Sequence, residues 1–341
     1  MCGILGSVNQ AFDEAMLNQI EHRGPDDFGI DFFTVKDHSI QFGQRRLSII
    51  DLSPAGHQPM ISPCKNYALI FNGEIYNHLD LRQKLPQDIV YNGHSDTETI
   101  LYYLSHFGAT AVEDFNGIFA IAFLDIDKAL LTLARDPFGV KPLYYHDDGS
   151  KLIFSSEIRP IKTMLATDEL NNEGLASLLR LRYNAAPSTL YKKINKVLPG
   201  NIYNVQLSAK QLVSTSSSFS KKLPAISKET TKSLTRGYGD ALEAAVKRQL
   251  LADVEVGILL SGGVDSAVIA ALAKKHYKGK LKAFTIGFEG DFEEDEIADA
   301  KQTAEILGLE HYTKKISFSD FLGLIKECSR IVEEPLATTS M

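Results

Sequence analysis

The order of the predicted secondary structure changes once along the chain, and this change limits the folds available to it. From Cys2 to about Gln206, short segments rich in β-branched and aromatic residues follow one another. We predict strands at Ile40–Gly43, Tyr67–Phe71, Ile118–Asp125, Ala129–Arg135 and Lys151–Ser155, and helices at Thr97–Phe107 and Asn172–Leu181. This pattern predicts an α+β domain in which helices flank layered strands.

After residue 233 strands and helices alternate, which predicts an α/β domain with a parallel sheet and crossover helices. The predicted elements are a helix at Tyr238–Leu251, strand Val256–Leu260, helix Ala267–Tyr277, strand Lys282–Phe288, helix Glu296–Leu307 and a strand near His311–Ile316. Residues 207–233 are rich in Ser, Lys and Thr without an apolar period, so we interpret them as a linker between domains at 2–206 and 234–341. A doubly wound sheet usually has more strands, and we therefore expect the second domain to be incomplete.

Composition narrows the class of function. The 341 residues suffice for two domains, and the net charge of -7 comes without a basic patch, so neither nucleic acid nor an anionic membrane is an expected partner. Three scattered cysteines argue against a disulfide framework. The N-terminus lacks signal-peptide features, and no stretch approaches the roughly 20 apolar residues of a spanning helix. We expect small-molecule chemistry in the cytoplasm.

The segment Ser261–Ser266 lies between an apolar strand and the start of a helix. Its adjacent glycines let the backbone approach an anion, and the helix N-terminus favours negative charge there, so the segment predicts a phosphate site. Asp265 suggests a Mg²⁺ ion that bridges carboxylate and phosphate. The alternative is an ordinary strand-to-helix turn. The segment matches neither the Walker A pattern nor the dinucleotide-binding turn.

The sequence Ser-Gly-Gly-Val-Asp-Ser resembles the PP-loop of ATP pyrophosphatases, which split ATP into AMP and pyrophosphate. The resemblance implies that Leu260 and Ile286 line the adenine. The implied ATP-binding set is Leu260, Ser261, Gly262, Gly263, Val264, Asp265, Ser266 and Ile286. The acidic run from Asp291 to Asp299 is better explained as a solvated loop and helix start than as a metal site.

Cys2 becomes the N-terminal residue if Met1 is removed, and its free α-amine then has a pKa near ~8. Such an amine can accept the thiol proton, so that one residue supplies both nucleophile and base. The alternative is a small buried apolar residue, which is the commoner role of a single cysteine. The polar motifs that follow favour the nucleophile.

Six motifs occur in an order that resembles class II glutamine amidotransferases. They are Met-Cys-Gly-Ile-Leu-Gly at 1–6, His-Arg-Gly-Pro-Asp at 22–26, Arg-Arg-Leu-Ser-Ile-Ile-Asp at 45–51, Phe-Asn-Gly-Glu-Ile-Tyr-Asn at 71–77, Gly-His-Ser-Asp-Thr-Glu at 93–98 and Arg-Asp-Pro-Phe-Gly-Val-Lys-Pro-Leu-Tyr at 135–144. With the PP-loop domain, the chain resembles the glutamine-dependent asparagine synthetase family. This implies an Ntn-hydrolase-like αββα sandwich followed by an incomplete domain similar to adenine nucleotide alpha hydrolases.

The resemblance also implies residue roles. Cys2 is the expected nucleophile, with the Asn72 side chain and the Gly73 backbone N–H as donors to the oxyanion. The remaining glutamine contacts are Arg46 and the Ile49 backbone for the α-carboxylate, and Asp96 with Glu74 for the α-ammonium. Simpler explanations are a surface ion pair for Arg46, a hairpin turn for Asn72-Gly73 and a helix N-cap for Asp96. We assign His22–Asp26 and Arg135-Asp136 to loop shape and the domain junction.

The implied reaction combines glutamine hydrolysis with ATP-dependent adenylation of aspartate, and gives asparagine, glutamate, AMP and pyrophosphate. ATP and Mg²⁺ are the implied cofactors, and a homodimer is compatible with the family. Two alternatives stay open: an amidotransferase that acts on another carboxylate, and a truncated homologue with only glutaminase or ligand-binding activity.

Overall fold

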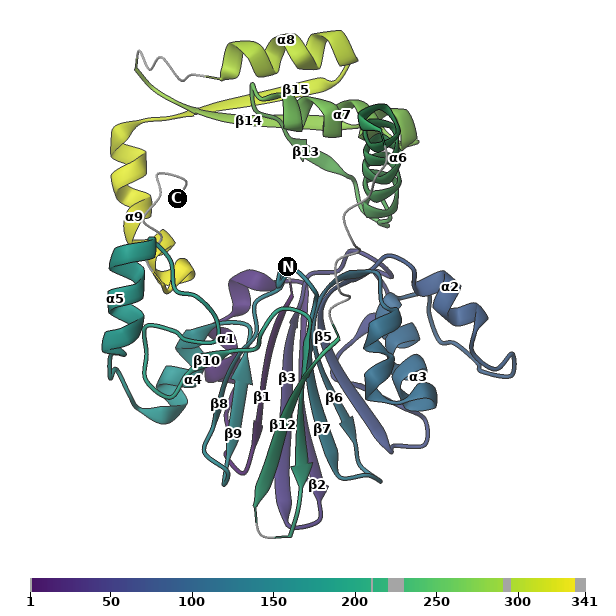
Figure 1. Ribbon diagram of the computed structural model, residues 1–341, viewed down its shortest axis with the longest axis vertical. Helices are drawn as coiled ribbons and strands as arrows, with labels where there is room; N and C mark the ends of the chain where they lie inside the picture. The colour runs from purple at the N-terminus through teal and green to yellow at the C-terminus, as the bar shows by residue number, and fades with distance from the viewer. Residues whose placement is uncertain (1, 210, 220–229, 291–295, 335–341) are drawn as a thin grey trace. The chain divides into compact units, whose positions relative to one another are not determined.

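The structure is a computed structural model that describes residues 2–209, 211–219, 230–290 and 296–334. The chain divides into two compact units, of which the first contains residues 1–222 and 332–341 and the second contains residues 223–331 (Figure 1). In sequence, the second unit is therefore an insertion into the first. None of the helices in the described part of the chain is both long and apolar enough to cross a membrane.

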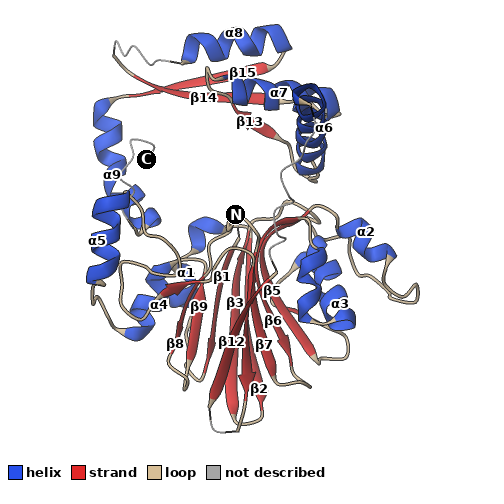
Figure 2. Ribbon diagram, viewed as in Figure 1, coloured by secondary structure: helices blue, strands red, loops and turns tan. Residues whose placement is uncertain are grey.

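The described residues of the first unit build two antiparallel sheets of six strands each (Figure 2). One sheet has the order β10-β8-β9-β1-β3-β2, with bounds Asn195–Lys196, Tyr144–Asp147, Leu152–Ser155, Gly3–Val8, His38–Arg46 and Asp27–Val35. The other has the order β12-β11-β7-β6-β5-β4, with bounds Leu212–Ser218, Asn201–Leu207, Leu130–Arg135, Gly117–Asp125, Tyr67–Ile75 and Met60–Ile61. Each of the predicted strands in this half of the chain lies within or largely overlaps one of these elements.

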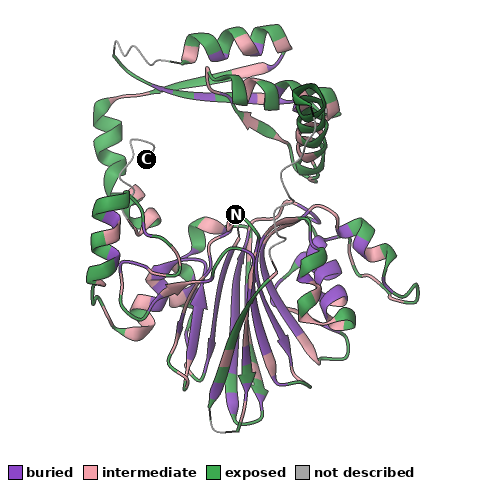
Figure 3. Cartoon of the chain, in the orientation of Figure 1, coloured by how far each residue is buried: buried purple, intermediate pink, exposed green. Residues whose placement is uncertain are grey.

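Both sheets bury apolar side chains on both faces. Successive residues of a strand point to opposite sides of the sheet, and both sets are apolar in the central strands. In β6, Ala120 and Ala122 face the core between the sheets, while Phe119 and Ile121 face the outer helices. Helices cover the outer faces of the two sheets. Figure 3 shows that most of their strand residues are buried. The covering helices are α1 (Glu14–Asn18) and α4 (Ile158–Leu165) at the first sheet, and α2 (His78–Gln83) and α3 (Asp96–Phe107) at the second. Helix α5 (Asn172–Leu181) belongs to the same unit. The expected αββα layering is confirmed.

The structure differs from the predicted linker at residues 207–233. Leu212–Ser218 forms β12 and pairs with β11 in a register that runs from Leu207↔Leu212 to Asn201↔Ser218. Helix α6 (Thr231–Gln249) then begins seven residues before the predicted Tyr238. Ladder hydrogen bonds come from the backbone, so a Ser-rich edge strand forms with little more than Leu212 in the core. Residues 220–229 of the predicted linker lie outside the described residues.

The second unit has a parallel sheet with the order β13-β14-β15 among its described residues, as the alternating pattern predicted. Its strands are Gly257–Leu259, Lys282–Phe288 and Glu310–Ile316, and its helices after α6 are α7 (Val264–His276), α8 (Ile297–Leu307) and α9 (Phe318–Val332). One face of β14 is buried through Ala283 and Thr285, whereas Ile286 on the other face is 62% exposed. Within the described residues, this sheet is therefore covered on one face only.

Candidate active site

Cys2 lies directly before β1 and contacts the backbone that follows β3. Its Sγ donates to the carbonyl oxygen of Leu47 at 3.6 Å and accepts from the Leu47 N–H at 3.4 Å. Burial raises the pKa of the Cys2 thiol, and the Leu47 hydrogen bond opposes this increase. A nucleophile here therefore needs a nearby base to remove its proton.

A pocket opens beside the thiol, and five separate segments of the first unit line it. Cys2 and the end of β3 form one side, and β5 and the start of α3 form the other. The lining residues are Cys2, Arg46, Leu47, Ile49, Ile50, Gln58, Phe71, Gly73, Glu74, Asp96 and Thr97. The structure thus brings six of the seven residues expected for glutamine together in one pocket, and the seventh, Asn72, adjoins Gly73 in β5.

Asn72 and Gly73 lie inside β5, opposite Ala120 and Phe119 of β6, so the alternative of a hairpin turn is wrong. Asn72 is fully buried, and neither polar atom of its side chain has a hydrogen-bond partner among the described residues. Such an orphaned amide is costly unless a ligand completes it. Gly73 has to be a glycine, because a Cβ there would lie 2.1 Å from the Ile118 carbonyl oxygen.

Two carboxylates share the pocket. Asp96 is buried and accepts a hydrogen bond from the Ile75 N–H at 2.9 Å, while Oε2 of Glu74 is buried without a described partner. Burial, followed by repulsion from Asp96, raises the pKa of Glu74 to about 8, and burial raises the pKa of Asp96 to about 6. Ser95, rather than Asp96, is the N-cap of α3. The pair is suited to an ammonium group, which would stabilise both ionised forms.

Arg46 is buried at the end of β3, which excludes the alternative of a surface ion pair. Its guanidinium donates to the carbonyl oxygens of Asp51 at 2.5 Å and Ser53 at 3.2 Å. These bonds fix the cation against the loop that follows Ile49, at the wall of the pocket. The arrangement offers a positive charge to a small anion.

Sequence analysis did not identify Gln58 as part of the pocket. Its side chain accepts from the Phe71 N–H at 2.7 Å and donates to the Thr97 hydroxyl at 3.2 Å. Gln58 thereby ties β5 to the first turn of α3. It lies in a loop outside all six motifs, and no pattern in the sequence indicates these contacts.

In the second unit the predicted phosphate loop connects β13 to α7, and Gly263 is the N-cap of that helix. The hydroxyls of Ser261 and Ser266 lie 2.9 Å apart. The Gly262 N–H donates to the Glu296 carboxylate at 3.1 Å, so an acidic side chain occupies one of the backbone donors predicted to bind an anion. The predicted loop is thus present, and the Glu296 carboxylate would compete with an anion for the Gly262 N–H.

The two proposed adenine residues lie in different surroundings: Leu260 is buried, whereas Ile286 is 62% exposed. Asp265 is exposed in the first turn of α7. Within the described ranges, no three His, Cys, Asp or Glu side chains are grouped as a metal site. A single carboxylate such as Asp265 is compatible with Mg²⁺, because Mg²⁺ usually takes most of its ligands from water and phosphate.

Comparisons with known proteins match two successive parts of the chain to two families. Residues 1–217 match the model of the glutamine amidotransferase domain family, and residues 237–341 match the asparagine synthase family. A solved glutamine phosphoribosylpyrophosphate amidotransferase from B. subtilis has 15% identity and a TM-score of 0.49, over 94% of this chain and 92% of that one.

Two curated relatives align with almost the whole chain. Asparagine synthetase [glutamine-hydrolyzing] 1 of Bacillus subtilis is 34% identical over 99% of this chain and 54% of its own length. Putative asparagine synthetase [glutamine-hydrolyzing] 2 of Methanocaldococcus jannaschii is 32% identical over 100% of this chain and 70% of its own. The chain therefore spans between about half and about two thirds of these relatives, and it belongs to the glutamine-hydrolysing asparagine synthetase family.

Proposed function

We propose that the first unit hydrolyses glutamine with Cys2 as the nucleophile, after Met1 has been removed. The observation that carries this proposal is the convergence of the thiol, Gly73 and the carboxylate pair on one pocket, with the orphaned Asn72 amide next to Gly73 in β5. In the proposed complex, Glu74 and Asp96 bind the α-ammonium group. Arg46 and the Ile49 backbone bind the α-carboxylate.

The chemistry follows from this placement. The α-amine of Cys2 takes the thiol proton, and the thiolate attacks the side-chain amide carbon of glutamine. The Asn72 amide and the Gly73 N–H donate to the oxyanion that forms. The proton passes to the leaving nitrogen, ammonia departs, and water cleaves the γ-glutamyl thioester to release glutamate and restore the thiol.

For the second unit we infer an ATP site at Ser261–Ser266, with Leu260 and Ile286 at the adenine. The proposed reaction adenylates aspartate with ATP and releases pyrophosphate, and ammonia then displaces AMP to give asparagine. Family membership and the loop between β13 and α7 support it. Mg²⁺ held through Asp265 would neutralise phosphate charge. The alternatives are another carboxylate acceptor and a chain with glutaminase activity alone.

The test of the glutaminase proposal measures glutamate release by the wild type, Cys2→Ala and Cys64→Ala. Loss of the nucleophile should lower the rate by at least about 10⁴-fold, because the other groups cannot replace the covalent step. Cys64, a free and exposed cysteine, is the matched control and should be neutral. Full activity in Cys2→Ala would refute the proposal.

The synthetase proposal needs its own assay, namely pyrophosphate release from ATP with aspartate and ammonia. Release that depends on aspartate supports it. Glutamate release without aspartate-dependent pyrophosphate would favour the glutaminase-only alternative, and release with a different carboxylate would identify another acceptor.

A further inference from the structure

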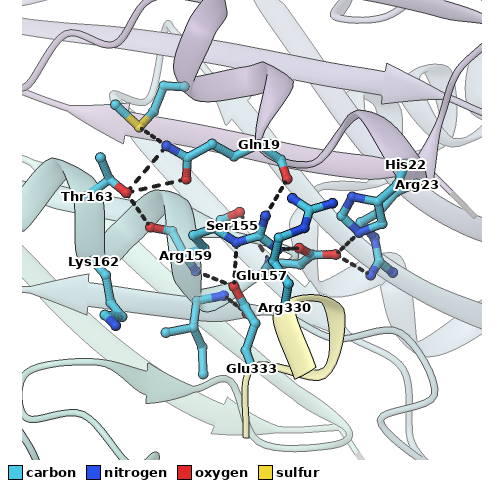
Figure 4. Close-up of polar contacts among 12 residues, drawn as sticks. Gln19, His22, Arg23, Ser155, Glu157, Arg159, Lys162, Thr163, Arg330 and Glu333 are labelled. Carbon is cyan, nitrogen blue, oxygen red and sulfur yellow. Dashed lines mark hydrogen bonds and ion pairs between the residues drawn. The ribbon is translucent and has the colours of Figure 1, made fainter. Parts of the chain in front are cut away.

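Glu157 is a buried carboxylate, between β9 and α4, that the proposed reaction does not use. Figure 4 shows the basic side chains around it. Its Oε1 lies 2.7 Å from His22 Nε2 and 3.0 Å from Arg23 Nη1, and its Oε2 lies 3.2 Å from Arg159 Nη2. Both oxygens of Glu157 are bound, so the orientation of its carboxylate is strongly constrained. Removing one member of such a buried cluster would leave an uncompensated charge.

Arg23 connects this carboxylate to the nucleophile. Its Nε donates to the carbonyl oxygen of Cys2 at 3.1 Å, while Nη1 binds Glu157. The guanidinium plane is therefore fixed at both ends. The neighbouring Ser156 pairs with the strand that follows Cys2, since its hydroxyl accepts from the Ile4 N–H at 3.0 Å. The turn from β9 into α4 thus supports the residue whose thiol must reach the substrate.

Glu333 reaches the same turn from the other side. It groups with the first unit, although it follows α9 directly. Its carboxylate accepts from the backbone N–H groups of Ile158 and Arg159, the latter at 2.6 Å, and lies 3.6 Å from Arg159 Nε. Helix α4 has no side-chain cap from its own N-cap residue, Glu157, so Glu333 supplies this cap.

Arg159 joins the two carboxylates, because its Nη2 binds Glu157 while its Nε faces Glu333. A continuous series of contacts therefore runs from Glu333 through Arg159, Glu157 and Arg23 to the Cys2 carbonyl. The adjacent Glu334 makes separate contacts, with Lys196 Nζ at 2.7 Å and the Leu190 N–H at 2.9 Å. Glu334 belongs to the same segment and not to the series.

On the basis of the proposed glutaminase function, we propose that Glu157 is a positioning residue for Cys2, and that Glu333 holds Glu157 in place through Arg159 and the first turn of α4. The rate of glutamine hydrolysis then depends on whether the segment after α9 is bound to α4. The physical reason is the narrow tolerance of covalent catalysis, in which small displacements of the nucleophile lower the rate strongly.

The experiment compares Glu157→Gln, Glu333→Gln and the matched control Glu334→Gln in the full chain. We expect kcat for glutamate release to fall about 10- to 100-fold in Glu157→Gln and about 3- to 10-fold in Glu333→Gln, with KM within about threefold. Glu334→Gln should stay within about twofold. Equal losses of kcat in Glu333→Gln and Glu334→Gln would show that any contact of this segment has the same effect, and would refute the proposed series of contacts.

A second measurement distinguishes positioning from a merely structural role and needs no turnover. Iodoacetamide alkylation of Cys2, followed by peptide mass spectrometry across pH, reports the ionisation of the thiol. Removing the charge of Glu157 leaves Arg23 uncompensated beside Cys2, so the midpoint should move down by about half a pH unit. An unchanged midpoint with a lower melting temperature would assign Glu157 to stability alone and overturn the proposal.

Two outcomes keep the proposals separate. If the wild type releases no glutamate while Glu157→Gln still shifts the alkylation midpoint, the function fails and the positioning of Cys2 stands. If Glu157→Gln does not fold, Arg159→Met breaks the series without altering Glu157 or Arg23. It should lower kcat at least as much as Glu333→Gln, and an unchanged kcat would refute the proposal.

Discussion

The two candidate sites lie on sheets that are covered to different extents. In the first unit, a leucine such as Leu69 is fully buried because helices and a second sheet cover both faces. In the second unit, Leu259 is 79% exposed on the open face of the parallel sheet. The pocket beside Cys2 accordingly has desolvated polar groups without partners among the described residues, whereas Asp265 and Ile286 are exposed. Burial of the surrounding sheet, rather than the motif alone, gives polar groups the environment that catalysis requires.

The same substitution in both sheets tests this difference most strongly. Leu69→Ala should lower the free energy of unfolding of the first unit by about 2–5 kcal/mol, because it opens a cavity in a packed core. Leu259→Ala should change the stability of the second unit by less than about 0.5 kcal/mol. Hydrogen exchange in increasing denaturant, read by mass spectrometry, reports each unit separately. Equal effects would contradict the assignment of an open face.

Asn72→Ala tests whether burial is used in catalysis. We expect kcat for glutamate release to fall about 10²–10³-fold with little change in KM, since in the proposed mechanism the amide donates only to the developing oxyanion. Asn66→Ala is the control, because Asn66 pairs with Asp127 at the surface. A large increase in KM with an unchanged kcat would instead assign Asn72 to ground-state binding.

The raised pKa values of Glu74 and Asp96 predict that glutamine binding releases protons. At pH 7 the pair retains part of a proton, because the pKa of Glu74 is about 8, and an ammonium ligand favours the ionised form. Affinity should therefore rise up to about tenfold between pH 6 and 8. Calorimetry of Cys2→Ala in buffers of different ionisation enthalpy measures the release directly.

In that experiment Glu74→Gln should abolish most of the proton release, while Glu21→Gln at the exposed Glu21 should retain it. Proton uptake on binding would show that the carboxylates do not contact the ammonium group.

The smallest effect is expected in the open unit. Glu296→Gln removes the charge that competes for the Gly262 N–H, so pyrophosphate without Mg²⁺ should bind about 3- to 10-fold more tightly. Glu305→Gln on the exposed side of the same helix should leave binding unchanged. Titration by calorimetry provides the measurement, and weaker binding in Glu296→Gln would assign Glu296 to the site as a ligand partner.

Sequence patterns predicted the elements that depend on local periodicity and the residues that belong to recognisable motifs. The alternation of strands and helices identified β14 with its observed bounds, Lys282–Phe288, and the motifs named pocket residues as distant as Cys2 and Asp96. They missed β12, whose serines pair through the backbone, and Gln58, whose contacts depend on tertiary placement. They also assigned His22–Asp26 to loop shape, since nothing local links Arg23 to Glu157.

The cap on α4 has a consequence for the order in which the protein is made. Glu333 and the Ile158 N–H are separated by 175 residues, so the ribosome completes the whole second unit before the cap exists. At typical synthesis rates this delay is on the order of 10–35 s. During this interval the nascent first unit carries α4 without its cap. If the proposed series supports Cys2, that support is complete only after Glu333 has left the ribosome.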